Sequence, residues 1–493
     1  VAFGLIAFAI LLSWRVDVNV FGFNMFYRNR IERCYMGASN LGRRPHPLTG
    51  LDPTDAPRLG DLVQGVSGHA DTGTPLLAQR PFPIVNAALN ITSSRNLAWQ
   101  ERKAASFSFT PMYCGYEIQD PDGRVISGYQ HTNDYVRNEG KWISLGLPIS
   151  VSGAAASPNE GYHSSAATAF LMTVFNVRLG WWLQNPRYAQ RWQRPGPRFS
   201  LFLLLQELAG MTNDESHYVY LSDGGHFENL GVYELVRRRC RYIIACDAGC
   251  DPKYGFEDLG NVIRKCQIDL GIGIDIDPRG IRPNAQSGHS DAHCAVGRIH
   301  YEQVDKNARP GFLFYVKASL TGGEPTDILQ YALEHAAFPH EATADQWYSE
   351  SQFESYRKLG FHAIDSALAD AVGEQGAPTR EWEADLEEVF TALSERWYPA
   401  SPQVRASFSK HGRAVEAIFE RIRKEENLRF LDGQIYPEWW HLTAAAQVGT
   451  PGPAPTPTML PKHVWEVRAG FYLCNSLLQI MENVYHDLNL DEQ

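Results

Sequence analysis

The chain has 493 residues, of which 44% are hydrophobic, 12% aromatic and 20% charged. That composition is typical of a globular protein and excludes wholesale disorder, collagen and coiled coil. Its 56 acidic residues outnumber its 45 Lys and Arg, for a formal net charge of -11, and no long basic run occurs, so nucleic acid is not expected as a partner.

The first fourteen residues, VAFGLIAFAILLSW, are almost wholly apolar and carry no charge. A membrane span needs about 20 such residues, and the basic region that opens a signal peptide is absent. We interpret 1–14 as the end of a transmembrane helix whose beginning precedes Val1, with a buried core helix as the alternative. Six Arg between 15 and 44, against Asp17 and Glu32, would place the rest of the chain on the cytoplasmic side by the positive-inside rule.

Residues 15–80 follow as a juxtamembrane arm and loop. Aromatic and Arg side chains are interleaved up to residue 44, in a stretch that suits either the lipid headgroup layer or packing on the folded domain. Residues 45–80 are rich in Pro, Gly, Asp and Thr, which predicts a loop. Further along we expect strands over 84–92 and 105–116, a long loop over 119–141 and a helical run over 167–183.

Strands and helices alternate from residue 201 to residue 320. We expect helices over 201–210, 228–240 and 259–271, and strands over 218–222, 242–247, 270–277, 296–301 and 312–320. This alternation predicts an α/β fold with a parallel or mixed sheet. Later in the chain we expect helices over 351–372, 380–397, 411–430 and 471–488, and a Pro-rich linker over 450–462.

The strongest local motif is S-D-G-G-H-F-E-N-L at 222–230. Asp223 ends an apolar strand, and Gly224 and Gly225 allow the backbone to turn sharply there with positive φ. Catalytic groups of α/β sheets collect at the carboxyl ends of strands, and a carboxylate there can take a proton from a nucleophile. The alternative is an Asx turn in which Asp223 caps the helix that follows.

A second motif is I-S-V-S-G-A-A-A-S-P at 149–158, where small residues let backbone segments approach closely. Its Ser152 suggests a nucleophile elbow, whose pattern is Gly-x-Ser-x-Gly on a strand-to-helix turn. Positions 150 and 154 are Ser and Ala, so both flanking glycines are absent. This absence counts against Ser152 as a nucleophile.

Metal-binding residue types are present but are not arranged in a known pattern. The eight Cys are dispersed, which predicts a reducing compartment, and no Cys-x-x-Cys occurs. The spacing of His289, His293, Cys294 and His300 matches no zinc site, so we expect neither metal nor cofactor. A metal hydrolase built on Asp223, His226 and the His289/His293 loop remains as an alternative.

These blocks, in this order, resemble the distal half of the patatin-like phospholipase domain, which cytosolic group IV phospholipases share. S-G-A-A-A-S-P at 152–158 resembles the segment that lines the family's site, and D-G-G-H-F-E-N-L at 223–230 resembles its Asp motif. The helix and strand after the motif, with D-A-G at 247–249, are similar as well. N-L-A-W-Q-E-R-K-A-A-S-F and Q-F-E-S-Y-R-K-L-G look like segments of large bacterial membrane-associated patatin-like proteins, and the resemblance covers roughly 15–365.

The resemblance implies an α/β, patatin-like three-layer sandwich over 81–365, with a mainly helical region over 366–493. In the family a Ser of Gly-x-Ser-x-Gly pairs directly with the Asp, and no catalytic His is used. No Gly-x-Ser-x-Gly occurs here, so we expect the nucleophile half to precede Val1. The resemblance makes Asp223 the catalytic residue. The expected lining of the substrate pocket is Ser152, Gly153, Pro158, Gly224, Gly225 and His226.

The implied function is that of a membrane-associated lipid acyl hydrolase. Its substrate would be a membrane lipid or lysophospholipid, it would use a Ser/Asp dyad without a cofactor, and this chain would supply the Asp. Alone, the chain is expected to be inactive. The alternative is a catalytically inactive, membrane-anchored scaffold with a degenerate hydrolase fold.

Overall fold

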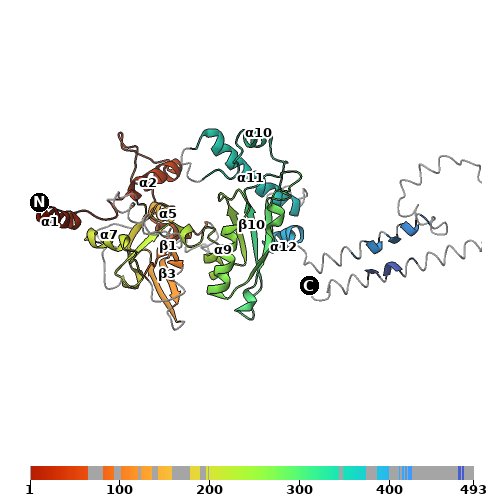
Figure 1. The fold of residues 1–493 in the computed structure, drawn as a ribbon, viewed down its shortest axis with the longest axis horizontal. Coiled ribbons are helices and arrows are strands. Elements are labelled where there is room, and N and C mark those ends of the chain that lie inside the picture. Colours follow the sequence, from red (N-terminus) through yellow and green to blue (C-terminus); the bar gives the residue numbers. More distant parts are fainter. Residues whose placement is uncertain are drawn as a thin grey trace, which may run out of the picture. The chain divides into compact units, whose positions relative to one another are not determined.

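The computed structural model describes two compact units, residues 1–397 and 398–493 (Figure 1). The described residues are 2–20, 22–64, 81–93, 102–119, 124–135, 143–157, 172, 178–188, 196–197, 199–342, 348–372, 386–398 and scattered positions of 410–481. The predicted helical run over 167–183 and the predicted linker over 450–462 lie mostly or wholly outside them. In the second unit, Ile418, Ile422 and Leu473 are buried together.

The first unit contains a six-stranded antiparallel sheet in the order β4-β3-β2-β1-β6-β5. Its strands are β1 Val85–Asn90, β2 Ala104–Phe109, β3 Tyr113–Gln119, β4 Val125–His131, β5 Trp181–Gln184 and β6 Tyr218–Ser222. Leu89, Phe107 and Leu221 lie in one buried cluster with Val151 of helix α5 (Gly146–Ser152). The helix therefore covers one face of the central strand pair β1 and β6.

Two predictions for this sheet are wrong. The single strand expected over 105–116 is a hairpin, because Pro111 lacks a backbone N–H and the chain reverses there. Thr110 closes the turn: its N–H donates to the Tyr113 carbonyl at 3.0 Å, and its hydroxyl oxygen accepts from the Tyr113 N–H at 2.9 Å. The long loop expected over 119–141 contains the edge strand β4, whose Gly and polar residues hide the alternation of a strand.

A second sheet of four strands, β7-β10-β9-β8, is mixed. Its strands are β7 Tyr242–Asp247, β8 Ile274–Ile276, β9 Cys294–Ile299 and β10 Gly311–Lys317. The β7–β10 pair is parallel, and the other two pairs are antiparallel. The coarse prediction of a mixed α/β fold is therefore confirmed, although β6 belongs to the antiparallel sheet.

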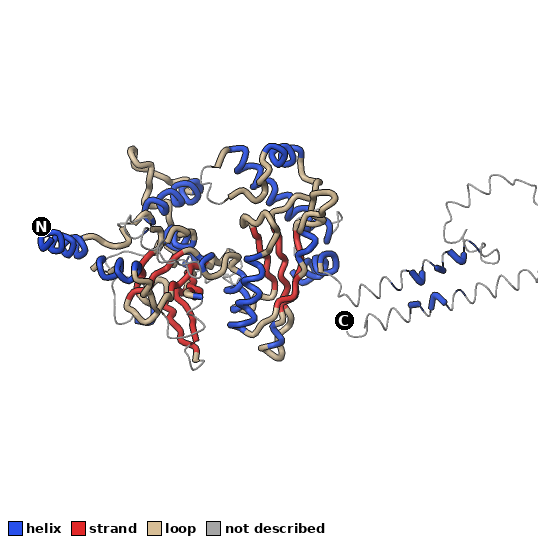
Figure 2. Tube along the Cα trace, in the orientation of Figure 1, coloured by secondary structure: helices blue, strands red, loops and turns tan. Residues whose placement is uncertain are grey.

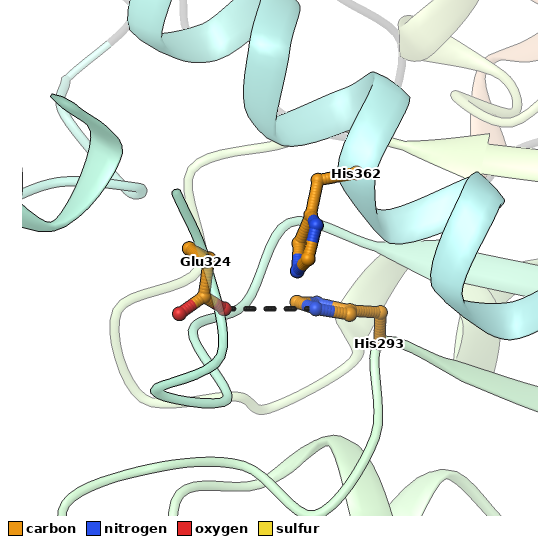
Figure 3. Close-up of side chains that lie close together, drawn as sticks. All are labelled: His293, Glu324 and His362. Carbon is orange, nitrogen blue, oxygen red and sulfur yellow. Dashed lines mark ion pairs between the residues drawn. The ribbon is translucent and has the colours of Figure 1, made fainter. Parts of the chain in front are cut away.

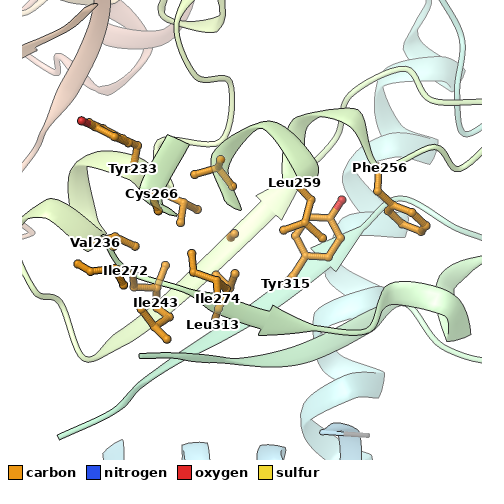
Figure 4. Close-up of a cluster of buried hydrophobic side chains, with 14 of the residues drawn as sticks. Tyr233, Val236, Ile243, Phe256, Leu259, Cys266, Ile272, Ile274, Leu313 and Tyr315 are labelled. Carbon is orange, nitrogen blue, oxygen red and sulfur yellow. The ribbon is translucent and has the colours of Figure 1, made fainter. Parts of the chain in front are cut away.

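Helices cover both faces of the four-stranded sheet (Figure 2). On one face, α8 (Val232–Arg237) and α9 (Glu257–Lys265) bury Val236 and Leu259 against Ile243 and Leu313 (Figure 4). On the other face, α11 (Glu350–Val372) and α12 (Leu386–Trp397) pack against β9 and β10. Residue 365, the predicted end of the hydrolase domain, lies inside α11. Helix α10 covers Thr326–Glu334.

The apolar N-terminal run forms helix α1 (Ala2–Arg15). Within the described part of the chain, no helix has the length and hydropathy of a membrane span. The helix docks on α7 (Ser200–Leu208), where the Leu201 N–H donates to the Ser13 hydroxyl at 2.7 Å and the Ser200 hydroxyl donates to the Val16 carbonyl.

The segment after α1 packs on the folded domain, as the second interpretation of the arm allows. Asn19 exchanges two hydrogen bonds of 2.8 Å with the backbone of Trp182. Helix α2 (Asn24–Ile31) is fixed by Asn24, which donates to the Leu179 carbonyl at 2.6 Å, and by Arg28, which donates to the Ser144 hydroxyl at 2.9 Å. A short helix α3 (Asp61–Gln64) follows.

A buried ion pair joins the parallel strands at their carboxyl ends. Lys317 of β10 donates to Asp247 of β7 at 2.9 Å, and both side chains are 2% exposed. The Tyr315 hydroxyl donates to the same carboxylate at 2.5 Å. Removing one partner of such a pair leaves an uncompensated charge in the interior.

We therefore expect Lys317→Met to lower the free energy of unfolding by about 3–5 kcal/mol in urea titrations of the full chain. Lys358→Met is the control, because Lys358 and Asp327 form an exposed pair and its loss should change stability little. Adding Asp247→Leu to Lys317→Met should recover part of the loss. A loss below about 1 kcal/mol in the single variant would mean that the pair does not hold the strands.

Candidate active site

A cavity of about 300 Å³ opens where β6 ends beside β1. It is open to solvent, and strands, helix α5 and the turn after β6 contribute its walls. The lining residues are Ile84, Val85, Asn86, Ser152, Asp223, Gly224, Gly225, Glu228, Asn229, Leu230 and Gly231. The structure thus brings Ser152 of the first predicted motif and Asp223, Gly224 and Gly225 of the second into one site.

Asp223 is half-buried at the end of β6. Its Oδ1 accepts a hydrogen bond from the Gly225 N–H at 2.7 Å and caps a one-turn 3-10 helix, Gly224–His226. The capping alternative is therefore realised. Burial raises the pKa of this carboxyl above its ordinary value of 3.8, and the Gly225 hydrogen bond offsets only part of that rise. The carboxylate therefore combines a local structural role with the property expected of a general base.

The prediction of positive φ at Gly224 and Gly225 is wrong. Glycine is needed in this turn because neighbouring atoms lie too close to leave room for a side chain. A Cβ on Gly224 would lie 2.8 Å from the backbone oxygen of Asn86 on the paired strand, which no side chain tolerates. A Cβ on Gly225 would meet only side-chain atoms of Asn229 and Asp223. Gly224 is therefore the residue that lets the turn pass under β1.

Ser152 faces the same cavity but does not form a nucleophile elbow. Its Oγ lies 3.6 Å from the position that a Cβ of Gly224 would take, so the hydroxyl is next to the Asp223 turn. Ser152 is the last residue of α5, whereas an elbow serine starts a helix. The end of a helix presents carbonyl oxygens, and an oxyanion needs N–H donors instead.

Gly153 makes room for a residue that the sequence did not suggest. A Cβ on Gly153 would lie 2.6 Å from the hydroxyl oxygen of Tyr27 on α2. Burial, and then the negative charge of Asp223, raise the pKa of Tyr27. Tyr27 is thus a neighbour of the site that sequence reasoning missed, because it lies in a stretch interpreted as an arm and no motif marks it.

Asn86 of β1 was also missed. It lines the cavity, and its Oδ1 is buried without a hydrogen-bond partner among the described residues. Buried polar atoms are rarely left unpaired in proteins, so a bound water or ligand group is the expected partner. The available signal was a polar residue inside an apolar strand, V-N-A-A-L-N.

The described lining of the cavity contains neither Gly153 nor His226, which were both expected there. His226 pairs with the Ser222 hydroxyl at 2.8 Å and is not among the described residues that line the cavity. Pro158 lies outside the described residues. The metal alternative on Asp223 and His226 is not borne out in the described part of the chain: the one group there with metal-like geometry joins His293 to Glu324 and His362.

The raised pKa of Asp223 predicts how the stability of the fold changes with pH. The folded state holds the proton more tightly than the unfolded chain, so Asp223 destabilises the fold increasingly as pH rises from 3.8 through its folded pKa. Asp223→Asn should therefore melt higher than the parent chain at pH 7, and the difference should shrink as pH falls toward 4. Asp291→Asn, at an exposed carboxylate, is the control. A lower melting temperature for Asp223→Asn at pH 7 would show that the carboxylate serves mainly as a cap.

No protein-family model matches the chain, and no curated protein matches it. Among solved structures, it is similar to human GIVD cytosolic phospholipase A2, with 14% sequence identity and a TM-score of 0.36 over 70% of this chain and 52% of that one. The chain thus spans about half the length of that structure. A TM-score this low does not establish a shared fold.

Proposed function

We propose that the cavity at Asp223 is the general-base half of a lipid acyl hydrolase site. The observation that carries the proposal is the carboxylate itself: half-buried, with a raised pKa, and placed in an open cavity at the end of a strand. Desolvation is the main cause of the rise, and among the described residues no basic side chain offsets it. The sequence resemblance to patatin-like phospholipases supplies the reaction class.

In this proposal, Asp223 accepts the proton of a serine hydroxyl as the serine attacks an acyl ester. A carboxylate with an ordinary pKa is a poor base for a hydroxyl, and desolvation makes it a better one. Tyr27 and Asn86 flank the same space. The Asn86 amide, with its unpaired buried oxygen, is suited to orient a polar group of the substrate or the attacking serine.

The proposed nucleophile is a serine other than Ser152. The position of Ser152 at the end of α5 supports a lining role, since the helix offers carbonyls there rather than the N–H groups of an oxyanion hole. The resembling family uses the serine of Gly-x-Ser-x-Gly, a motif that does not occur within these 493 residues.

We expect a fluorophosphonate serine probe to leave this chain unlabelled. When a segment that contains Gly-x-Ser-x-Gly is joined to the chain, the longer protein should be labelled and should hydrolyse a lysophospholipid. In that longer protein, Asp223→Asn should lower kcat about 10²-fold or more, because a positioned base contributes that much. Asp291→Asn serves again as the matched control.

Three results would contradict the proposal. Labelling of the present chain that disappears in Ser152→Ala would make Ser152 the nucleophile. Full activity of Asp223→Asn in the longer protein would exclude Asp223 as the base. A longer protein that is neither labelled nor active would favour the second candidate function, an inactive scaffold with a degenerate hydrolase fold. The absent Gly-x-Ser-x-Gly is the observation that keeps this second candidate open.

We further propose that α1 and α7 contact a lipid surface. Large apolar side chains are exposed on both helices: Phe3, Phe8, Ile10, Leu11 and Trp14 on α1, and Phe202 and Leu205 on α7. An apolar cleft of about 230 Å³ runs between the two helices. Contiguous apolar surface of this kind marks an interaction site, and Arg15 at the end of α1 suits anionic headgroups.

The double variant Phe202→Ser/Leu205→Ser should therefore bind anionic phospholipid vesicles at least about tenfold more weakly in co-sedimentation, since it removes two apolar side chains from the contact. Phe361→Ser is the control: this phenylalanine is 67% exposed on α11, against 59% for Phe202. Equal binding by the double variant and the parent chain, or an equal loss in the control, would exclude this surface as the lipid contact.

A further inference from the structure

Three side chains from separate segments beside the second sheet converge on one point. His293 directly precedes β9, Glu324 lies between β10 and α10, and His362 lies on α11. One ligand atom from each lies within 4.8 Å of the other two. Figure 3 shows a ring nitrogen of His362 directed toward the other two side chains. His293 and Glu324 are each about 4% exposed, and His362 is partly exposed.

Hydrogen bonds fix the orientation of His293. Its Nδ1 lies 3.0 Å from the Ser319 hydroxyl oxygen, and that hydroxyl donates to the Lys317 carbonyl. The other ring nitrogen, Nε2, lies 3.4 Å from the Thr321 hydroxyl oxygen and 3.6 Å from Oε1 of Glu324. The imidazole is therefore held at Nδ1 and directs Nε2 toward the Glu324 carboxylate, without a direct hydrogen bond between the two groups.

Glu324 is held just as firmly by its own loop. Its Oε1 accepts from the Thr321 N–H at 2.5 Å and from the Thr321 hydroxyl at 3.0 Å, and its Oε2 accepts from the Gly322 N–H at 2.8 Å. A histidine and a carboxylate that are both fixed by outer hydrogen bonds are typical of metal ligands, because those bonds set the tautomer and the direction of the lone pairs.

The spacing also fits a metal ion. Two ligands at about 2.0–2.1 Å from a tetrahedral Zn²⁺ are separated by about 3.3 Å. The 3.6 Å between His293 Nε2 and Glu324 Oε1 is already close to that separation. A small movement of the partly exposed His362 side chain would complete the set.

We propose that His293, Glu324 and His362 bind one divalent transition-metal ion, Zn²⁺ by preference, with water in the fourth position. Two imidazoles and one carboxylate are ligands that suit Zn²⁺, and three protein ligands leave one position open. Such an ion would tie β9, the loop before α10 and helix α11 together. This site is independent of the proposed hydrolase function, since none of its ligands lines the Asp223 cavity.

The test is equilibrium dialysis of the chelator-treated full chain against Zn²⁺ alone. We expect one bound Zn²⁺ per chain, and a melting temperature that rises when Zn²⁺ is added. His362→Ala should weaken binding about 100-fold or more, because even outer-shell changes cost 10–100-fold. The same variant should abolish the visible absorption of the Co²⁺-substituted protein. His289→Ala, in the neighbouring loop, should keep the full stoichiometry.

His362 lies on a partly exposed helix face, so alanine should preserve the fold there, and circular dichroism checks this. His293→Ala should also weaken Zn²⁺ binding, and if that buried variant does not fold, His362→Ala decides the question. The proposal is overturned if the folded parent chain binds no Zn²⁺, because the group is then a histidine–glutamate ion pair. It is equally overturned if His362→Ala binds as the parent does, or if His289→Ala loses the metal.

Discussion

The close approach of β1 and β6 is the constraint on which the candidate active site depends. Gly224 passes so near the Asn86 carbonyl that a Cβ would lie 2.8 Å from its oxygen. Because glycine occupies that position, the turn after β6 can fold under β1 and bring Asp223 beside Asn86 and Ser152. The same logic holds at Gly153, where the missing side chain admits the Tyr27 hydroxyl. Gly224 and Gly153 are therefore needed because they leave room for neighbouring atoms that a larger residue would displace.

The first unit contains two carboxylates in contrasting surroundings: Asp247 is paired with a lysine, and Asp223 has no basic partner among the described residues. Asp247 and Lys317 neutralise each other in the interior, Tyr315 adds a hydrogen bond, and a second carboxylate, that of Asp251, lies 3.7 Å from the Lys317 ammonium. Asp223 has no such partner among the described residues, and its pKa rises. A compensated pair holds strands together, whereas an uncompensated carboxylate in a cavity destabilises the fold and is typical of functional sites. The two carboxylates thus support different roles.

The N-terminal segment connects the proposed site and the proposed lipid contact. Asn19 bonds Trp182 of β5, Asn24 bonds Leu179 just before β5, and Arg28 bonds Ser144 just before α5, so the arm is part of the folded unit. Helix α2 then carries Tyr27 to Gly153, and α1 adds its exposed apolar side chains to those of α7. Apolar surface left uncovered in this way is costly in water and suits a nonpolar environment.

Local patterns in the sequence determined most of the elements between 201 and 320, the Asp223 turn and the mixed α/β class, because strand alternation, helix periodicity and Gly punctuation act over a few residues. They failed at 105–116 and 119–141, where a proline turn and an edge strand interrupt the alternation. Only the tertiary structure decided that Tyr27 and Asn86 neighbour Asp223, and that His293 meets Glu324 and His362. Contacts between residues far apart in the chain follow from strand pairing and helix packing, and a single sequence carries no local signal for them.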